Sequence, residues 1–188
     1  MSNSMVHVSK FLSLILRHRP EVIGITLDPE GWADIEELIQ KSDGKLTRDL
    51  IDQAVRENDK KRFAVSEDGK RIRASQGHSL KDVDLKFEPV EPPAALYHGT
   101  SSKVIKAINA EGLQKMSRQH VHLSADLETA YKVGDRHGGT SFTLQVDAKG
   151  MHADGHQFFR SENDVWLTDS VPRQYIVPVD LTELVRRG

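Results

Sequence analysis

The sequence of 188 residues has no cysteine, few aromatic residues and no large excess of either charge. The absence of cysteine excludes a disulfide framework and thiolate chemistry, and it suits a reducing compartment, so we expect a cytoplasmic protein. No apolar run approaches the length of a membrane span, and residues 1–10 have no apolar signal core, so we expect no membrane association. A formal net charge of −2 also argues against a strongly basic coat for nucleic acid, so such contacts must come from a local cluster of basic residues.

The hydrophobic content of 37% is enough to form real cores, and a segment rich in proline and charge divides the chain. This segment, residues 87–93, reads FEPVEPP and has no apolar periodicity, as is typical of a linker. We therefore predict an α+β protein with one lobe over residues 1–88, a linker over 89–94 and a β-rich lobe over 95–188.

The first lobe is predicted to consist of three helices followed by a β-hairpin. An apolar helical face over residues 8–16 ends before Pro20, and Asp34 and Thr47 are the expected N-caps of two further helices. The period then changes to two over residues 62–65 and 71–74, and the Asp68-Gly69 pair between them favours a hairpin. This order is the winged-helix pattern, which most often binds DNA, but the third helix mixes acidic and basic residues and would lie poorly along phosphates.

A candidate anion site lies between Leu96 and Ser124, where the pattern indicates a strand, a turn, a helix and a second strand. A Gly99-Thr100-Ser101 turn at a helix start would offer backbone N–H groups and hydroxyls to a pyrophosphate. His98 and His122 would flank this turn from neighbouring strands. His120 and His122 share a strand face and could bind metal, but no third ligand stands at a recognised spacing, so we expect no metal.

The rest of the second lobe is predicted to contain one short helix and several strands. Asp126 is the expected cap of a helix through Val133, and a glycine-rich loop with Arg136 follows it. Strands are expected at residues 141–146, 165–167 and 175–177.

Several short motifs, in this order, closely resemble the RNA 2′-phosphotransferase family, known as KptA in bacteria. They are Ser9-Lys10-Phe11-Leu12, Leu16-Arg17-His18, Gly31-Trp32, Lys61-Arg62-Phe63, Gln76-Gly77-His78-Ser79, Tyr97-His98-Gly99-Thr100, His120-Val121-His122-Leu123-Ser124, Arg136-His137-Gly138 and Val165-Trp166-Leu167-Thr168. Each motif alone is weak, but their joint order and spacing are specific, and they span nearly the whole chain.

The resemblance implies a winged-helix lobe joined to an ADP-ribosyltransferase-like lobe that binds NAD, with the active site in the cleft between them. NAD would be consumed as a co-substrate while an internal 2′-phosphate is removed from RNA, as in tRNA splicing and RNA repair, and we expect a monomer. The RNA phosphate would attack the nicotinamide-bearing ribose carbon, and nicotinamide would leave. The neighbouring ribose hydroxyl would then attack phosphorus, which releases repaired RNA and ADP-ribose 1″,2″-cyclic phosphate.

Matching of the motifs implies a basic catalytic quartet and a set of NAD-binding residues. The quartet falls on Arg17, His18, Arg62 and Arg136. The NAD-binding positions fall on Tyr97, His98, Gly99, Thr100, Ser101, His122, Leu123 and Ser124. Asp164 departs from the family pattern, because glycine is expected there in many relatives.

The chemistry of these residue types fits the implied reaction. A phosphate dianion is already a nucleophile and needs cations to place it rather than a base, and arginine can grip it with two parallel hydrogen bonds. His18 could donate a proton to the departing RNA oxygen in the second step, which we state as a hypothesis. Three alternatives stay open: a DNA-binding regulator with a nucleotide-sensing domain, an ADP-ribosyltransferase acting on protein or on nucleic-acid ends, and a histidine-metal hydrolase.

Overall fold

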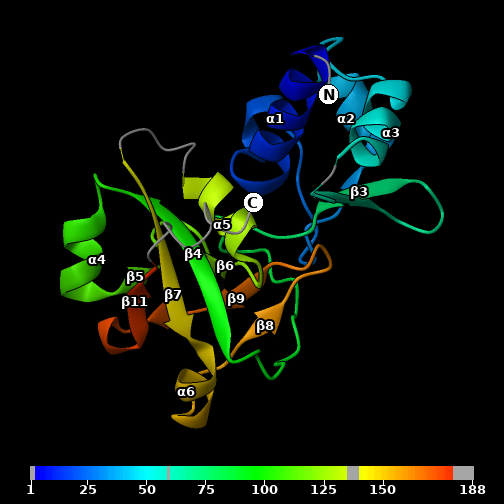
Figure 1. Ribbon diagram of the computed structural model, residues 1–188. Coiled ribbons are helices and arrows are strands. Elements are labelled where there is room, and N and C mark those ends of the chain that lie inside the picture. Colours follow the sequence, from blue (N-terminus) through cyan, green and yellow to red (C-terminus); the bar gives the residue numbers. More distant parts are fainter. Residues whose placement is uncertain (1–2, 59, 135–139, 180–188) are drawn as a thin grey trace. The chain divides into compact units, whose positions relative to one another are not determined.

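The computed structural model describes residues 3–58, 60–134 and 140–179 (Figure 1). The protein combines α-helices with small antiparallel sheets, which agrees with the predicted α+β class. The chain divides into two compact units, Met1–Lys86 and Phe87–Gly188.

The helices of the first unit begin and end close to the predicted positions. They are α1 (Asn3–Arg17), the 3-10 helix η1 (Pro20–Ile23), α2 (Ile35–Lys41) and α3 (Arg48–Arg56). Both predicted caps are confirmed, because Asp34 Oδ1 accepts the Glu37 N–H at 2.9 Å and Thr47 Oγ1 accepts the Leu50 N–H at 3.3 Å. As predicted, α1 ends before Pro20, which opens η1.

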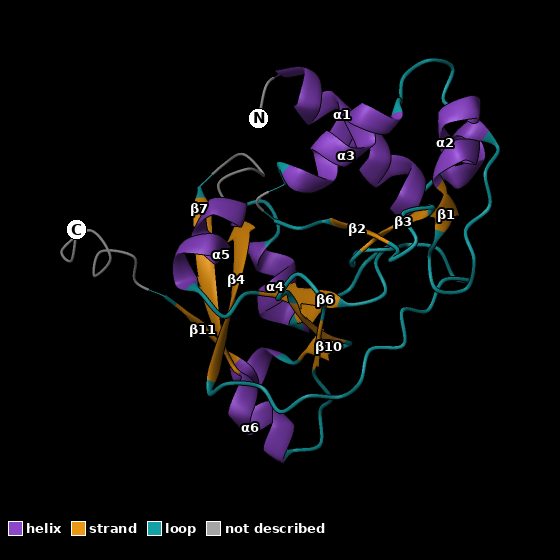
Figure 2. Ribbon diagram, turned by 90° about the vertical axis from the view of Figure 1, so that its right-hand side faces the viewer, coloured by secondary structure: helices purple, strands orange, loops and turns teal. Residues whose placement is uncertain are grey.

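A three-stranded antiparallel sheet completes the first unit, and α1 and α3 lie beside it in Figure 2. Its strands, in the order β1-β3-β2, are β1 (Ala33–Asp34), β3 (Arg71–Ala74) and β2 (Phe63–Val65). The predicted hairpin is confirmed, and Phe63 and Ile72 point into a core shared with Ile15, Leu16 and Ile51. Because side chains alternate along a strand, Arg71 and Arg73 lie on the face of β3 opposite to Ile72.

Within residues 87–134 and 140–179, the second unit contains three small antiparallel sheets. The first has the order β11-β7-β4, with β4 (Ala95–Ser101), β7 (Ser141–Asp147) and β11 (Ile176–Pro178). The second has the order β6-β9-β8, with β6 (Val121–Leu123), β8 (Phe159–Arg160) and β9 (Trp166–Thr168), and the third pairs β5 (Leu113–Gln114) with β10 (Ser170–Val171). Tyr97 and Ser124 exchange backbone hydrogen bonds of 2.8 Å, so the end of β6 lies beside β4.

In the part of the second unit that the structure describes, three α-helices and one 3-10 helix connect these strands. They are α4 (Ile105–Glu111), α5 (Leu127–Gly134), α6 (Ala148–Ala153) and η3 (Arg173–Tyr175). Asp126 caps α5 as predicted, since its carboxylate accepts the N–H groups of Glu128 and Thr129. The sequence did not predict α6, a six-residue helix that contains a glycine and is capped by Asp147.

The predicted Gly99-Thr100-Ser101 turn is wrong. All three residues belong to β4, where they pair with Thr143, Phe142 and Ser141 of β7. The next helix, α4, begins only at Ile105 and has no side-chain cap, and β5 follows it at Leu113. The extended ladder with β7 prevails over the small-residue turn signal, so no helix start is available at this position to bind an anion.

The segment predicted as a linker runs along the second unit. The Val90 N–H donates to the Phe158 carbonyl at 2.8 Å, and Pro89 forms a β-bridge with Phe159. The ring of Phe87 lies 6.3 Å from that of His120. These contacts explain why the division between the compact units falls between Lys86 and Phe87.

Candidate functional site

A cluster of basic side chains forms at the C-terminal end of α1. Arg17 is the last residue of this helix and is partly buried. Its Nη2 donates to the Arg62 carbonyl at 3.5 Å, and its guanidinium carbon lies 6.0 Å from the centre of the Phe63 ring. The end of α1 and the start of β2 therefore bring together two residues that are 45 positions apart in sequence.

Arg62 is held by contacts on both its main chain and its side chain. Its carbonyl accepts the Ser75 N–H at 2.9 Å, and its Nη1 donates to Asn58 Oδ1 at 3.2 Å. Asn58 is itself buried, so the amide that orients this guanidinium has little freedom to move. Nothing in the sequence pattern had identified Asn58.

His18 follows Arg17 and is more exposed, yet its ring is also fixed. Nδ1 of His18 lies 3.0 Å from Ser79 Oγ, within hydrogen-bonding distance. The Ser79 N–H donates to the Arg17 carbonyl at 2.9 Å, which satisfies one of the acceptors left open at a helix end. The described first unit thus brings together three of the four predicted catalytic residues, while Arg136 lies outside the described residues.

His78 is a completely buried neighbour of this cluster. Burial lowers its pKa from 6.5 to about 4, and the positive charges of Arg17, His18 and Arg73 act in the same direction. The Leu16 backbone nearby acts in the opposite direction on this pKa but does not cancel these effects. His78 is therefore uncharged at neutral pH and adds no cation to the cluster.

In the second unit, β4 and β6 bring several of the predicted NAD-binding residues side by side. His98 Nδ1 lies 3.0 Å from the His122 carbonyl, and the Tyr97–Ser124 backbone pair holds the strands in this register. Nδ1 of His122 also lies 3.4 Å from Arg118 Nη1. The prediction that His98 and His122 stand on neighbouring strands is confirmed.

The other predicted NAD-binding residues are packed inside the unit. Thr100 and Ser101 are each only 4% exposed, and the Leu123 side chain belongs to the hydrophobic core. A ligand could meet Leu123 only through its main chain.

Gly99 is a point of close approach between β4 and α5, two elements that lie side by side in Figure 1. A Cβ atom at this position would lie 1.7 Å from the Ala130 carbonyl oxygen and 2.6 Å from the Gly134 nitrogen. Because both atoms belong to the backbone of α5, only glycine allows the helix to approach so closely. The glycine of the motif thus has a packing function here.

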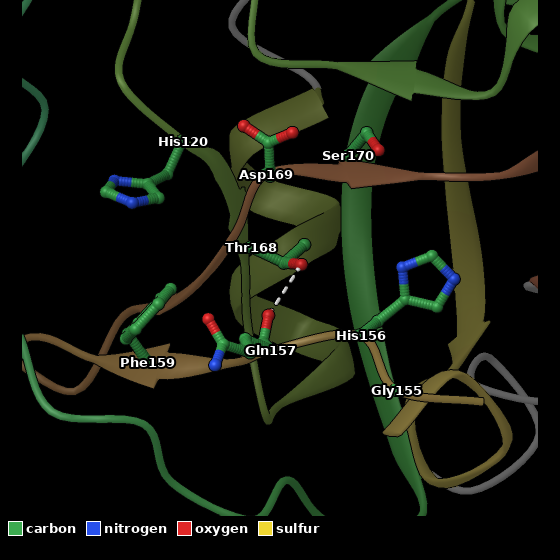
Figure 3. Close-up of a pocket in the computed structure, with 8 residues that line it drawn as sticks. All are labelled: His120, Gly155, His156, Gln157, Phe159, Thr168, Asp169 and Ser170. Carbon is green, nitrogen blue, oxygen red and sulfur yellow. Dashed lines mark hydrogen bonds between the residues drawn. The ribbon is translucent and has the colours of Figure 1, made fainter. Parts of the chain in front are cut away.

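A pocket of about 460 Å³ lies at another place in the second unit (Figure 3). Its lining residues are His120, Gly155, His156, Gln157, Phe159, Thr168, Asp169 and Ser170. Figure 3 shows His120 and Phe159 on one side and His156 on the other, and the Thr168 hydroxyl donates to the Gln157 carbonyl at 3.0 Å. The His120 ring packs against both Phe87 and Phe159, and none of the predicted catalytic or NAD-binding residues lines this pocket.

Searches for a metal site and for a membrane span gave negative results for the described part of the chain. No three His, Asp or Glu side chains in residues 3–58, 60–134 and 140–179 are grouped so that they could hold a metal ion. No helix within the same ranges is long and apolar enough to cross a bilayer.

Asp164 occupies a left-handed backbone conformation, with φ of 62°. Its N–H donates to the Ser161 carbonyl at 3.0 Å, and its carboxylate pairs with Arg160 at 2.9 Å. Asp is among the few residues other than glycine that adopt this conformation at modest cost. The turn therefore forms although the expected glycine is replaced.

These features define a two-unit α+β protein with a cluster of arginine and histidine suited to hold an anionic group. Comparison with known families then identifies it more closely, because the model of the RNA 2′-phosphotransferase, Tpt1/KptA family matches residues 3–170. The chain belongs to this family, whose members are transferases.

Individual relatives are similar over nearly their whole length. A protein of Rhodopirellula baltica is 55% identical over 175 residues, which cover 92% of this chain and 95% of the relative. One of Acaryochloris marina is 53% identical over 96% of this chain and 100% of its own. One of Flavobacterium johnsoniae is 56% identical over 90% of this chain and 93% of its own. Each of the three is named a probable RNA 2′-phosphotransferase.

Proposed function

We propose that this protein removes an internal 2′-phosphate from RNA and consumes NAD in doing so. The observation that carries the proposal is that Arg62, 45 positions away in sequence, lies beside Arg17 and His18 at the end of α1 in a chain of this family. Two guanidinium groups and an imidazole can hold a phosphate dianion through hydrogen bonds of about 1.5 to 3 kcal/mol each.

The proposed reaction has two steps. An oxygen of the RNA 2′-phosphate attacks the ribose carbon that carries nicotinamide, the carbon–nitrogen bond breaks, and nicotinamide leaves. The adjacent ribose 2″-hydroxyl then attacks phosphorus and loses its proton to solvent, and the bond between phosphorus and the RNA 2′-oxygen breaks. His18 donates a proton to this oxygen, and the products are RNA with a free 2′-hydroxyl and ADP-ribose 1″,2″-cyclic phosphate.

In this proposal the first unit is a winged-helix lobe that holds the RNA phosphate, and the second unit is an ADP-ribosyltransferase-like lobe that binds NAD. The succession of three helices and a hairpin supports the first assignment, and the neighbouring Tyr97, His98, His122 and Ser124 support the second. The resemblance to the family also assigns Arg136 to the basic quartet. A DNA-reading role is less favoured, because Arg48 on α3 is engaged by Asp52 at 3.0 Å rather than presented to phosphates.

The test is incubation of RNA bearing one internal 2′-phosphate with the protein, with and without NAD. We expect dephosphorylated RNA, nicotinamide and cyclic phosphate only when NAD is present. Arg17→Ala and Arg62→Ala should each slow turnover by about tenfold to a hundredfold. Arg17→Lys should restore it only in part, because an ammonium group cannot form two parallel hydrogen bonds to phosphate.

Arg48→Ala is the matched control, because it also removes an arginine, in this case an exposed one. The ion pair with Asp52 that is lost contributes under about 1 kcal/mol to stability. Release of inorganic phosphate without NAD would contradict the proposal. Equal loss of activity in the Arg17→Ala and Arg48→Ala variants would do so as well. Transfer of ADP-ribose to RNA ends, with the 2′-phosphate retained, would favour the ADP-ribosyltransferase alternative.

A further inference from the structure

The segment Gln76-Gly77-His78-Ser79 follows β3 and returns to the end of α1. Ser79 makes two contacts there, with consecutive residues of the proposed site. Its N–H donates to the Arg17 carbonyl at 2.9 Å, and its hydroxyl lies 3.0 Å from His18 Nδ1. One residue thus connects the main chain of the first catalytic arginine to the ring of the catalytic histidine.

We propose that Ser79 is a positioning residue that fixes the His18 imidazole, so that Nε2 is the nitrogen acting on the RNA phosphate. This inference rests on the function proposed above. The backbone contact anchors Ser79 to the same helix end that carries His18, so the hydroxyl is held at a defined distance from the ring. An imidazole bound at Nδ1 keeps one orientation, and its second nitrogen then points in a defined direction.

A serine hydroxyl suits a histidine that gives up a proton. When His18 is charged, Nδ1–H donates to Ser79 Oγ and Nε2 carries the proton to be transferred. After that proton has passed to the departing RNA 2′-oxygen, the neutral ring retains Nδ1–H and the same hydrogen bond to Ser79. No group has to rotate during the transfer, whereas a carboxylate at this position would hold the charged ring more tightly and oppose proton release.

The variant Ser79→Ala separates the effect of the hydroxyl on the His18 ring from the effect of the backbone bond to Arg17. It removes the hydroxyl and keeps the N–H that donates to the Arg17 carbonyl. Ser79→Thr is the conservative partner, because it retains a hydroxyl on the same carbon. The primary measurement is the ¹⁵N chemical shifts of the His18 imidazole in the full chain without substrates, assigned with the help of His18→Gln. These shifts report the tautomer and the hydrogen bond at Nδ1, which a merely structural role of Ser79 would not alter.

We expect Ser79→Ala to change the His18 ¹⁵N shifts and to slow the second step about tenfold, so that ADP-ribosylated RNA accumulates. Ser79→Thr should restore both the shifts and the rate. Unchanged His18 shifts in Ser79→Ala would overturn the inference whatever the activity. Altered shifts with an unchanged second step would show that the fixed ring has no catalytic role and would overturn it as well.

The two proposals fail in different ways. If the unaltered protein does not act on 2′-phosphorylated RNA with NAD, the proposed function fails and the claim that Nε2 acts on the RNA phosphate fails with it. The imidazole shifts would then still decide whether Ser79 fixes the ring. If the unaltered protein turns over and Ser79→Ala matches it in both measurements, only the inference about Ser79 fails.

Discussion

At the scale of single residues, the proposed phosphate site depends on which of its nitrogen groups carry charge. Arg17 and Arg62 have side chains that stay protonated in proteins. His78, completely buried next to Arg17, has its pKa lowered to about 4 and is neutral. The site therefore has charged arginines at its surface and an uncharged imidazole beneath them, so that no buried histidine carries a positive charge next to Arg17.

The lowered pKa of His78 makes the stability of the protein depend on pH. Between pH 6.5 and about 4 the unfolded chain binds a proton at this residue and the folded chain does not, so the free energy of unfolding decreases as the pH falls through this range. The full difference is about 3 kcal/mol. His78→Leu should lose this part of the pH dependence while keeping the dependence due to other groups.

Urea unfolding of the unaltered protein and of His78→Leu, at several pH values between 7 and 4, measures how the free energy of unfolding of each depends on pH. We expect the two stability curves to diverge by about 3 kcal/mol over that range. Parallel curves would contradict the prediction. An NMR titration of the His78 ring in the unaltered protein gives the same answer if the leucine variant does not fold.

At the scale of secondary structure elements, α5 approaches β4 so closely that position 99 has no room for a side chain. Gly99→Ala would place a methyl group 1.7 Å from a backbone oxygen of α5, which cannot move aside as a flexible side chain could. We expect a loss of at least about 3 kcal/mol in the free energy of unfolding, or displacement of α5.

Gly155→Ala is the control, since an added Cβ there meets nothing within 4 Å. It should cost only about 1 kcal/mol, because its φ of 92° disfavours side chains. Chemical denaturation of the two variants provides the measurement. If Gly99→Ala proved no less stable than Gly155→Ala, the close approach of α5 would not be the reason for glycine at position 99.

The elements predicted from sequence were those with a local signal. Asp34, Thr47 and Asp126 each cap a helix through a hydrogen bond within their own turn, and Asp68-Gly69 closes a hairpin between alternating strands. The Gly99-Thr100-Ser101 prediction failed because the same small residues suit a turn or a strand that a helix crosses closely. The pairing with β7 and the approach of α5 decide between them, and neither is a local signal. The two-residue β1 was missed because it is too short to show a period.

The candidate site was predicted in part, for a related reason. Arg17, His18 and Arg62 follow from the resemblance to the family, but no spacing rule brings residue 17 next to residue 62. The supporting contacts from Asn58 and Ser79 depend on how β2 and the segment after β3 return to α1. Ser79 at least lies within a motif that carries the resemblance, whereas Asn58 has no such signal.

At the scale of the whole molecule, the charge balance limits how RNA can be held. A net charge of −2 gives no general attraction for polynucleotide, so binding should depend on the few cations of the site. If Arg17, Arg62 and Arg136 each neutralise phosphate charge, the logarithm of the affinity for single-stranded RNA should fall with the logarithm of salt concentration with a slope of about −2.

Titration of 2′-phosphorylated RNA at several salt concentrations measures this slope, and Arg62→Ala should make it shallower by about 0.7. Arg48→Ala, which leaves the proposed site intact, should not change it. A slope steeper than about −5 would require a broad basic surface and would contradict a phosphate site made of a few arginines. A shallow slope also implies that RNA without the 2′-phosphate binds weakly, because the group to be removed then provides much of the charge that the protein recognises.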